Sequence, residues 1–216
     1  IYLGNPNVHH LDGTLFAKPL IRGLGKPKVF SASTVDQRPK EVASGLMFGT
    51  TLSVAVPDID RTDLVVLMGA NPLESNGSLA TAPDWPGRLA AVRDRGGRVV
   101  VIDPRRTKTA RAADAHLAIR PGADALLLAA VVTELARTGR VDPGHAGEWT
   151  VGLDEAIASL AAFTPESVAV RSGVSPDEIR SLAAQLADAK SAVVYGRIGT
   201  TTQRFGTLAS WLVDVV

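Results

Sequence analysis

The chain has 216 residues, of which 45% are hydrophobic, and its 23 basic and 22 acidic residues nearly cancel, which excludes disorder and argues against a surface devoted to nucleic acid. It contains no cysteine, so a disulfide, a thiolate zinc site, an iron–sulfur cluster and a cysteine nucleophile are all excluded within it. Apolar runs are too short for a membrane segment.

Both ends of the sequence are apolar. Ile1-Tyr2-Leu3 is typical of the last half of a buried strand, and residues 210–216 form an apolar helical pattern. Because termini are usually polar and exposed, we expect a fragment of a longer polypeptide. Any targeting signal would lie upstream, and the location we expect is the cytoplasm.

Strand and helix patterns alternate through the chain after a loop region that we expect over residues 1–50. A helix should begin near Pro39, and the start of the last long helix carries an N-cap Ser175, Pro176 and Glu178. Apolar runs predict strands at 64–69, 98–103, 115–119 and 191–196. Amphipathic or apolar patterns predict helices at 86–95, 123–137 and 175–188.

Strands separated by helices of this length pair in parallel through right-handed crossovers. We therefore predict a doubly wound, mostly parallel α/β sheet with helices on both faces, Rossmann-like and truncated at both ends. One such domain should span residues 1–216.

The charges are unevenly distributed along this predicted domain. Residues 86–120 contain nine basic and three acidic residues, a net charge of +6, whereas residues 142–188 carry a net charge of −6. A basic stretch concentrated on a few loops suits an anionic ligand better than a long nucleic acid, although a solvated helix face has the same composition.

Two of the predicted strands end in residues suited to sugar and phosphate. Asn71 and Ser75 follow the first strand and offer neutral donors. Asp103 ends the second strand, where its carboxylate can accept from ribose hydroxyls, and Arg105 and Arg106 can bind phosphate oxygens. Taken singly, each motif is better explained as a turn or a cap.

A third strand is followed by Arg120, Gly122 and Asp124. Asp124 falls in the first turn of a predicted helix, where an acidic side chain is favourable for the helix alone. Its carboxylate could also accept the paired N1–H and N2–H₂ donors of guanine. Because carboxyl ends of parallel strands share one edge, the three segments together predict a nucleotide site.

Neither common phosphate-binding loop is present. Gly23-Leu24-Gly25 begins like the dinucleotide fingerprint, but Lys28 stands where its third glycine belongs and no strand precedes it. The chain also lacks the GxxxxGK[ST] loop. The ligand must therefore be held by other loops.

An ordered set of strings resembles the molybdopterin oxidoreductases, the molybdenum or tungsten enzymes of the dimethyl-sulfoxide-reductase and formate-dehydrogenase type. The strings are PDIDRTD at 57–63, LMGANP at 67–72, VIDPRRTKTA at 101–110, AD at 113–114, RPGAD at 120–124, TPES at 164–167, GVS at 173–175 and GRIGTTTQ at 196–203. The resemblance covers almost the whole chain, which would be the central part of a larger catalytic subunit.

The resemblance implies a metal held by the dithiolenes of two molybdopterin guanine dinucleotides, with two-electron redox chemistry or oxygen-atom transfer at the metal. One guanine dinucleotide would be bound by Gly69, Asn71, Pro72, Glu74, Ser75, Asp103, Arg105, Arg106, Thr107, Arg120, Gly122 and Asp124. The pterin side would be lined by Gly196, Gly199 and Gln203.

The metal ligand implied by the resemblance has two candidates in the segment 28–37. Counting without gaps from Gly25 selects Asp36, which we rank first, whereas aligning Phe30-Ser31 with the Tyr-Ser of sulfoxide reductases selects Ser31. Either oxygen donor suits a high-valent metal. A purely structural loop, with Asp36 capping the next helix, is the third interpretation.

The resemblance also implies a small-molecule substrate and an electron-transfer partner or iron–sulfur domain outside this chain. We expect the isolated chain to be inactive and without bound molybdenum, because half of the cofactor cage is missing. The alternative is a non-catalytic nucleotide-binding α/β module that never holds a metal.

Overall fold

The computed structural model describes residues 1–4, 10–25, 27–80 and 82–216. Its strands are β1 (Tyr2–Leu3), β2 (Phe30–Ser31), β3 (Leu64–Met68), β4 (Arg98–Ile102), β5 (Ala115–Leu117) and β6 (Ala192–Gly196). Its α-helices are α1 (Leu11–Gly23), α2 (Ser33–Asp36), α3 (Arg38–Phe48), α4 (Pro72–Ser75), α5 (Trp85–Asp94), α6 (Lys108–Ala112), α7 (Asp124–Arg137), α8 (Leu153–Leu160), α9 (Pro165–Ser172), α10 (Pro176–Asp188), α11 (Ile198–Thr201) and α12 (Gly206–Val215).

The main sheet has the strand order β5-β4-β3-β6, and every pair in it is parallel. The predicted parallel α/β fold and its four strands are therefore confirmed. From β3 the chain proceeds outward through β4 to β5 and then returns to place β6 on the other side of β3. The strand order thus reverses between β3 and β6, and in open α/β sheets ligands bind beside such a reversal.

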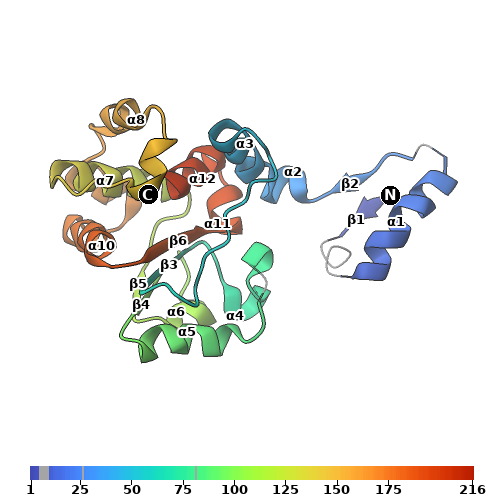
Figure 1. Cartoon of the computed structure of the whole chain (residues 1–216), viewed down its shortest axis with the longest axis horizontal. Coiled ribbons are helices and arrows are strands. Elements are labelled where there is room, and N and C mark those ends of the chain that lie inside the picture. Colours follow the sequence, from blue (N-terminus) through green and yellow to red (C-terminus); the bar gives the residue numbers. More distant parts are fainter. Residues whose placement is uncertain (5–9, 26, 81) are drawn as a thin grey trace.

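Alternate residues of the strands point to opposite faces of the sheet, and each face is covered by helices (Figure 1). Val66 and Val100 pack with Leu127 of α7 in one core, which α9, α10 and α12 complete. Val65 and Val101 pack in the other core, where α5 contributes its apolar side. Both faces of the strands are buried, which explains why their sequences are continuously apolar rather than alternating.

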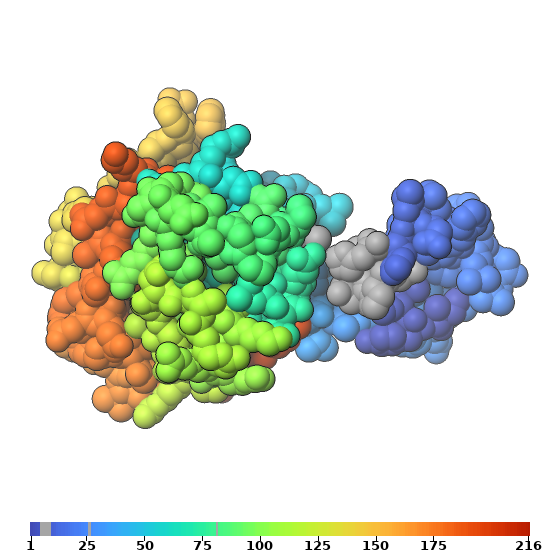
Figure 2. Space-filling model, turned by 90° about the horizontal axis from the view of Figure 1, so that it is seen from below, coloured from blue at the N-terminus to red at the C-terminus, as the bar shows by residue number. Residues whose placement is uncertain are grey.

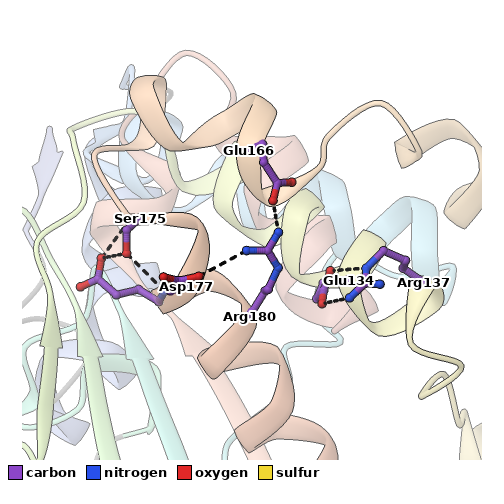
Figure 3. A network of polar contacts seen from close by, with 7 residues as sticks. Glu134, Arg137, Glu166, Ser175, Asp177 and Arg180 are labelled. Carbon is purple, nitrogen blue, oxygen red and sulfur yellow. Dashed lines mark hydrogen bonds and ion pairs between the residues drawn. The ribbon is translucent and has the colours of Figure 1, made fainter.

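The helices on the α7 side are held together at their outer surface by polar contacts (Figure 3). Arg180 of α10 pairs with Glu166 of α9 and with Asp177, 3.4 Å away, in its own first turn. The predicted start of α10 is confirmed: the Ser175 and Glu178 side chains each accept from the other residue's backbone N–H, at 3.3 and 2.9 Å. The Arg180–Glu166 pair joins α10 to α9 at the surface, while the packing of these helices comes mainly from the apolar core beneath them.

The described residues up to Ser31, namely 1–4, 10–25 and 27–31, form an arm that projects from the α/β body (Figures 1 and 2). The expectation of a loop region over residues 1–50 is corrected here, since α1 and α3 are regular helices. The opening strand exists but is not buried: Tyr2 is 66% exposed. Tyr2 is exposed because β1 lies outside the main sheet, in a two-stranded sheet where it pairs in parallel with β2.

Candidate functional site

The carboxyl ends of β3 and β6 touch through two glycines. The N–H of Gly199 donates to the carbonyl of Gly69 at 3.0 Å. Gly69 has a φ of +54°, and a Cβ built on it would lie 2.7 Å from the Cα of Gly199. Glycine is therefore required at position 69 both by its conformation and by the approach of the second turn.

Asp124 and Gln203 lie together beside this contact. The Gln203 amide nitrogen donates to Asp124 Oδ2 at 2.7 Å and to the Gly199 carbonyl at 3.1 Å. Its amide oxygen, Oε1, is buried without a hydrogen-bond partner in the described part of the chain. A buried acceptor left open in this way is suited to a donor supplied by a ligand.

The pKa of the Asp124 carboxyl is shifted by its buried position. Burial, which leaves the residue only 5% exposed, raises the pKa of its carboxyl. The hydrogen bond from Gln203 opposes this rise, while the charge of the nearby Asp103 adds to it. Two carboxylates predicted to share one ligand are therefore close enough to interact.

Asp103 is held in a turn at the end of β4. Its Oδ1 accepts the backbone N–H of Arg105 at 2.8 Å, which fixes the direction of the carboxylate. The side chains of Arg105 and Arg106 are exposed and have no partner among the described residues. Thr107 is buried and caps α6 by accepting from the N–H of Ala110 at 3.1 Å.

Most of the basic stretch 86–120 is engaged in internal contacts rather than open to an anion. Arg88 pairs with Asp60 and Arg93 with Asp114, while Arg95 donates to backbone carbonyls. Arg105 and Arg106 are thus the part of the stretch that stays exposed at the strand ends, and the net charge of the whole segment overstated the size of an anion site.

The α4 turn after β3 is joined to the α6 turn after β4. The hydroxyl of Thr109, which lies within the VIDPRRTKTA string but was assigned no role there, donates to Asn71 Oδ1. Glu74 pairs with Lys108 at 3.0 Å, so its charge is offset within the protein. Two more predicted site residues lie in this turn. Pro72 is buried, and the hydroxyl of Ser75 donates to the Asn71 carbonyl at 3.2 Å.

Two predicted site residues have other surroundings. The guanidinium of Arg120 donates to the Val170 carbonyl of α9 at 2.7 Å, so it is not bonded to the other candidates. Gly196 packs against α12, since its Cβ would lie 2.9 Å from Val213. Gly122, by contrast, lies beside the Asp124–Gln203 pair: it is exposed, and a Cβ on it would lie 3.9 Å from Gln203 Oε1.

The two candidate metal ligands lie five residues apart, one in the last strand of the arm and one in the short helix that follows it. Ser31 belongs to β2 of the arm, where its hydroxyl lies 2.5 Å from that of Ser33. Asp36 ends α2, and its carbonyl accepts from the Thr201 hydroxyl of α11 at 2.6 Å. The helix α3 begins without a side-chain cap, so Asp36 does not serve as one.

Two further observations concern the described residues as a whole. They contain no group of three or more His, Cys, Asp or Glu side chains that could hold a metal ion. None of their helices is both long and apolar enough to span a membrane.

Comparison with known proteins places the chain in a family. The family model for molybdopterin oxidoreductases matches residues 13–215. Formate dehydrogenase H of Escherichia coli is 35% identical over 150 residues, which are 69% of this chain and 20% of that protein. The assimilatory nitrate reductase of Haloferax mediterranei is 34% identical over 158 residues, 73% of this chain and 21% of that protein.

A solved structure has the same fold. Acetylene hydratase from Pelobacter acetylenicus superposes with a TM-score of 0.75 at 22% identity, over 92% of this chain and 26% of the other. The chain thus spans about a fifth of the length of the relatives that it matches. It belongs to the molybdopterin oxidoreductase family, whose members carry a molybdenum or tungsten molybdopterin cofactor.

Proposed function

We propose that this chain binds the guanine dinucleotide end of a molybdopterin cofactor, as part of a longer molybdenum or tungsten oxidoreductase. The observation that carries the proposal is the pair formed by Asp124 and Gln203 at the reversal of strand order. The pair offers carboxylate oxygens and one open amide oxygen, and guanine presents N–H donors along one edge.

The neighbouring residues fit the rest of a dinucleotide. Asp103 has a fixed carboxylate that suits ribose hydroxyls or guanine, and the exposed Arg105 and Arg106 suit the diphosphate. Gln203, which the resemblance assigned to the pterin side, is bonded to Asp124, so we propose it for the guanine side instead.

The residues of this edge bind and orient the nucleotide. When bound, the cofactor supplies two-electron redox chemistry or oxygen-atom transfer at its metal. Asp36 is our proposed metal ligand, because its backbone is bonded to the same β6–α11 turn as the nucleotide edge, whereas Ser31 lies in the arm. The substrate-binding loops and the electron-transfer partner or iron–sulfur domain are proposed to lie outside these residues.

Calorimetry with nucleotides tests the guanine site on the 216-residue chain. Guanosine monophosphate should bind more tightly than adenosine monophosphate, and Asp124→Asn should weaken it about 10- to 100-fold by replacing an acceptor with a donor. Asp188→Asn, which changes an exposed carboxylate paired with Arg140 of the outer surface, is the control. Equal binding of the two nucleotides would overturn the proposal.

Elemental analysis distinguishes the enzyme from a non-catalytic nucleotide-binding module. The longer polypeptide should contain stoichiometric metal and release guanosine monophosphate on acid hydrolysis, whereas the 216-residue chain should contain no metal. In the longer polypeptide, Asp36→Ala should change the metal site and Ser31→Ala should not. A longer polypeptide that binds guanine nucleotide without metal would support the module.

A further inference from the structure

The turn between β6 and α12 contacts both the nucleotide edge and the segment of the candidate metal ligand. On one side, Gly199 is bonded to Gly69 and Gln203 to Asp124. On the other side, side chains of the same turn reach the residues that end α2. One short segment of chain therefore contacts both of these parts of the molecule directly.

Thr201 makes the closest of these contacts. Its side-chain hydroxyl donates to the carbonyl of Asp36 at 2.6 Å, with a longer contact of 3.1 Å to the Ile198 carbonyl of its own helix, and the residue is only 3% exposed. Asp36 is the last residue of a single-turn helix, so its carbonyl belongs to those that the helix itself cannot pair. The Thr201 hydroxyl satisfies this carbonyl and fixes the backbone from which the Asp36 carboxylate extends.

Arg197 adds a second contact to the same segment. Its guanidinium donates to Gln37 Oε1 at 3.0 Å and to the Ser78 hydroxyl at 2.7 Å. Neither partner is charged, and none of the ion pairs of the described residues includes Arg197. Planar guanidinium groups hold two acceptors in a fixed relation, which suits a group that positions one loop against another.

We propose that Thr201, assisted by Arg197, is a positioning residue for Asp36: the two side chains set where its carboxylate lies relative to the nucleotide-binding edge. The inference rests on the proposed function, which assigns Asp36 as the metal ligand. The contacts themselves are independent of any cofactor, so they can be tested without one.

Amide hydrogen exchange of the 216-residue chain measures the anchoring directly. The N–H groups of Asp36 and Gln37 are bonded within α2 and its end, to the carbonyls of Ala32 and Ser33. Thr201→Val should accelerate their exchange about tenfold, because the opened segment loses one hydrogen bond. Thr201→Ser keeps the hydroxyl and should exchange like the wild type.

Two more variants complete the comparison. Thr202→Val is the matched control, since the exposed Thr202 hydroxyl is bonded only to the Ile198 carbonyl of its own helix, at 2.7 Å. Arg197→Gln removes both guanidinium contacts and should also accelerate hydrogen exchange at the Asp36 and Gln37 amides. It provides the test if Thr201→Val does not fold. Exchange at the wild-type rate in both Thr201→Val and Arg197→Gln would overturn the inference.

X-ray absorption at the metal edge, in the longer polypeptide, then separates positioning from a purely structural role. Thr201→Val should weaken the signal of the oxygen ligand while guanosine monophosphate release stays at the wild-type level, and Thr202→Val should change neither. A Thr201→Val spectrum identical to that of Thr202→Val would refute positioning. Absence of guanosine monophosphate from the wild type would refute the proposed function instead, and the exchange rates would still decide whether Thr201 anchors Asp36.

Discussion

Helices α1 and α7 have nearly the same length, 13 and 14 residues, but opposite surroundings. Every residue of α1 is described and none is buried, and Leu15 and Phe16 are 59% and 70% exposed. In α7, Leu127 and Val131 are fully buried between the sheet and the outer helices. Apolar residues in a helical pattern therefore do not make a core by themselves; a face of the sheet must lie opposite them.

This difference in burial indicates which part of the molecule contributes most to the free energy of unfolding. Burying a leucine side chain contributes roughly 1.5–3 kcal/mol, which α7 gains several times over and α1 does not. We therefore expect substitutions in the α/β body to lower the free energy of unfolding strongly, and substitutions in the arm to leave it nearly unchanged.

The largest effect is expected at the buried ion pair that joins α3 to α12. Lys40 Nζ lies 2.7 Å from Asp214, and both side chains are more than nine-tenths buried. Lys40→Ala leaves a buried carboxylate without its cation and should cost about 4 kcal/mol in urea unfolding. Replacing Lys40 by Met and Asp214 by Leu together should restore most of this loss.

The matched control for the ion pair is Arg140→Ala. Arg140 pairs with Asp188 at the surface, where such pairs are worth roughly 0–1 kcal/mol. Equal losses in Lys40→Ala and Arg140→Ala would contradict the distinction between buried and exposed pairs in this fold.

Leucine truncation compares the two helices directly. Leu127→Ala in α7 should lower the free energy of unfolding by about 3–4 kcal/mol, because it leaves a cavity against the sheet. Leu15→Ala in α1 should lower it by less than about 0.5 kcal/mol. Both values come from the same denaturant titration, and a loss above 1 kcal/mol for Leu15→Ala would show that the arm is packed in solution.

A third variant concerns the glycine contact at the candidate site. Gly69→Ala should cost about 2–3 kcal/mol, since it combines a left-handed conformation with a close approach to Gly199. Gly96→Ala is the control, because Gly96 has a φ of +84° but no heavy atom within 4 Å of a built Cβ. The difference between the stability losses of the two variants measures the contribution of the close approach between Gly69 and Gly199. Equal losses would show that this contact does not contribute.

The pH dependence of stability should have opposite signs at the two ends of α7. Burial raises the pKa of Asp124, so the folded protein holds that proton to a higher pH than the unfolded chain does. The free energy of unfolding of the wild type therefore falls as pH rises through this raised pKa. Asp124→Asn has no such proton to lose, so its stability relative to the wild type should increase over the same pH range. Urea unfolding at a series of pH values above 3.8 measures the gain.

Glu134 supplies the comparison for this titration. The hydrogen bond from Arg137 lowers the pKa of Glu134, so its contribution to stability is present above the ordinary pKa of 4.5 and is lost as pH falls. The stability of Glu134→Gln relative to the wild type should therefore decrease as pH rises, which is the reverse of the change expected for Asp124→Asn. Parallel pH profiles for the two variants would contradict the assigned causes.

The body of the fold was predictable from sequence because its signals are local. The strands read as continuous apolar runs, and Ser175 with Glu178 marked the start of α10. The order of the strands was not predictable, since the return of β6 to the side of β3 depends on packing between distant segments. The arm was misread for the same reason: Ile1-Tyr2-Leu3 looks buried, but only the fold decides whether anything covers it.

The candidate site was predictable in part. Motifs at strand ends identified Asp103 and Asp124, whose proximity follows from the parallel sheet. They gave no role to Thr109 or Thr201, although both lie within the quoted strings, because a threonine has no distinctive spacing and its role depends on a partner far away in sequence. Net charge also misled, because it counts arginines without telling which of them already have partners.

The smallest effect is expected from removing residues 1–29, which are all of the arm except β2. The arm projects from the body (Figure 2), its two-stranded sheet is separate from the main sheet, and α1 has no buried residue, so the deletion removes no described residue of either core. The free energy of unfolding should change by less than about 0.5 kcal/mol, and the binding of guanosine monophosphate should stay as it was. Denaturant titration and calorimetry of the shortened chain measure both. Because Asp36 is anchored by Thr201 and not by the arm, its amide should also keep its wild-type exchange rate, and a faster rate would mean that the arm helps to hold the ligand segment in place.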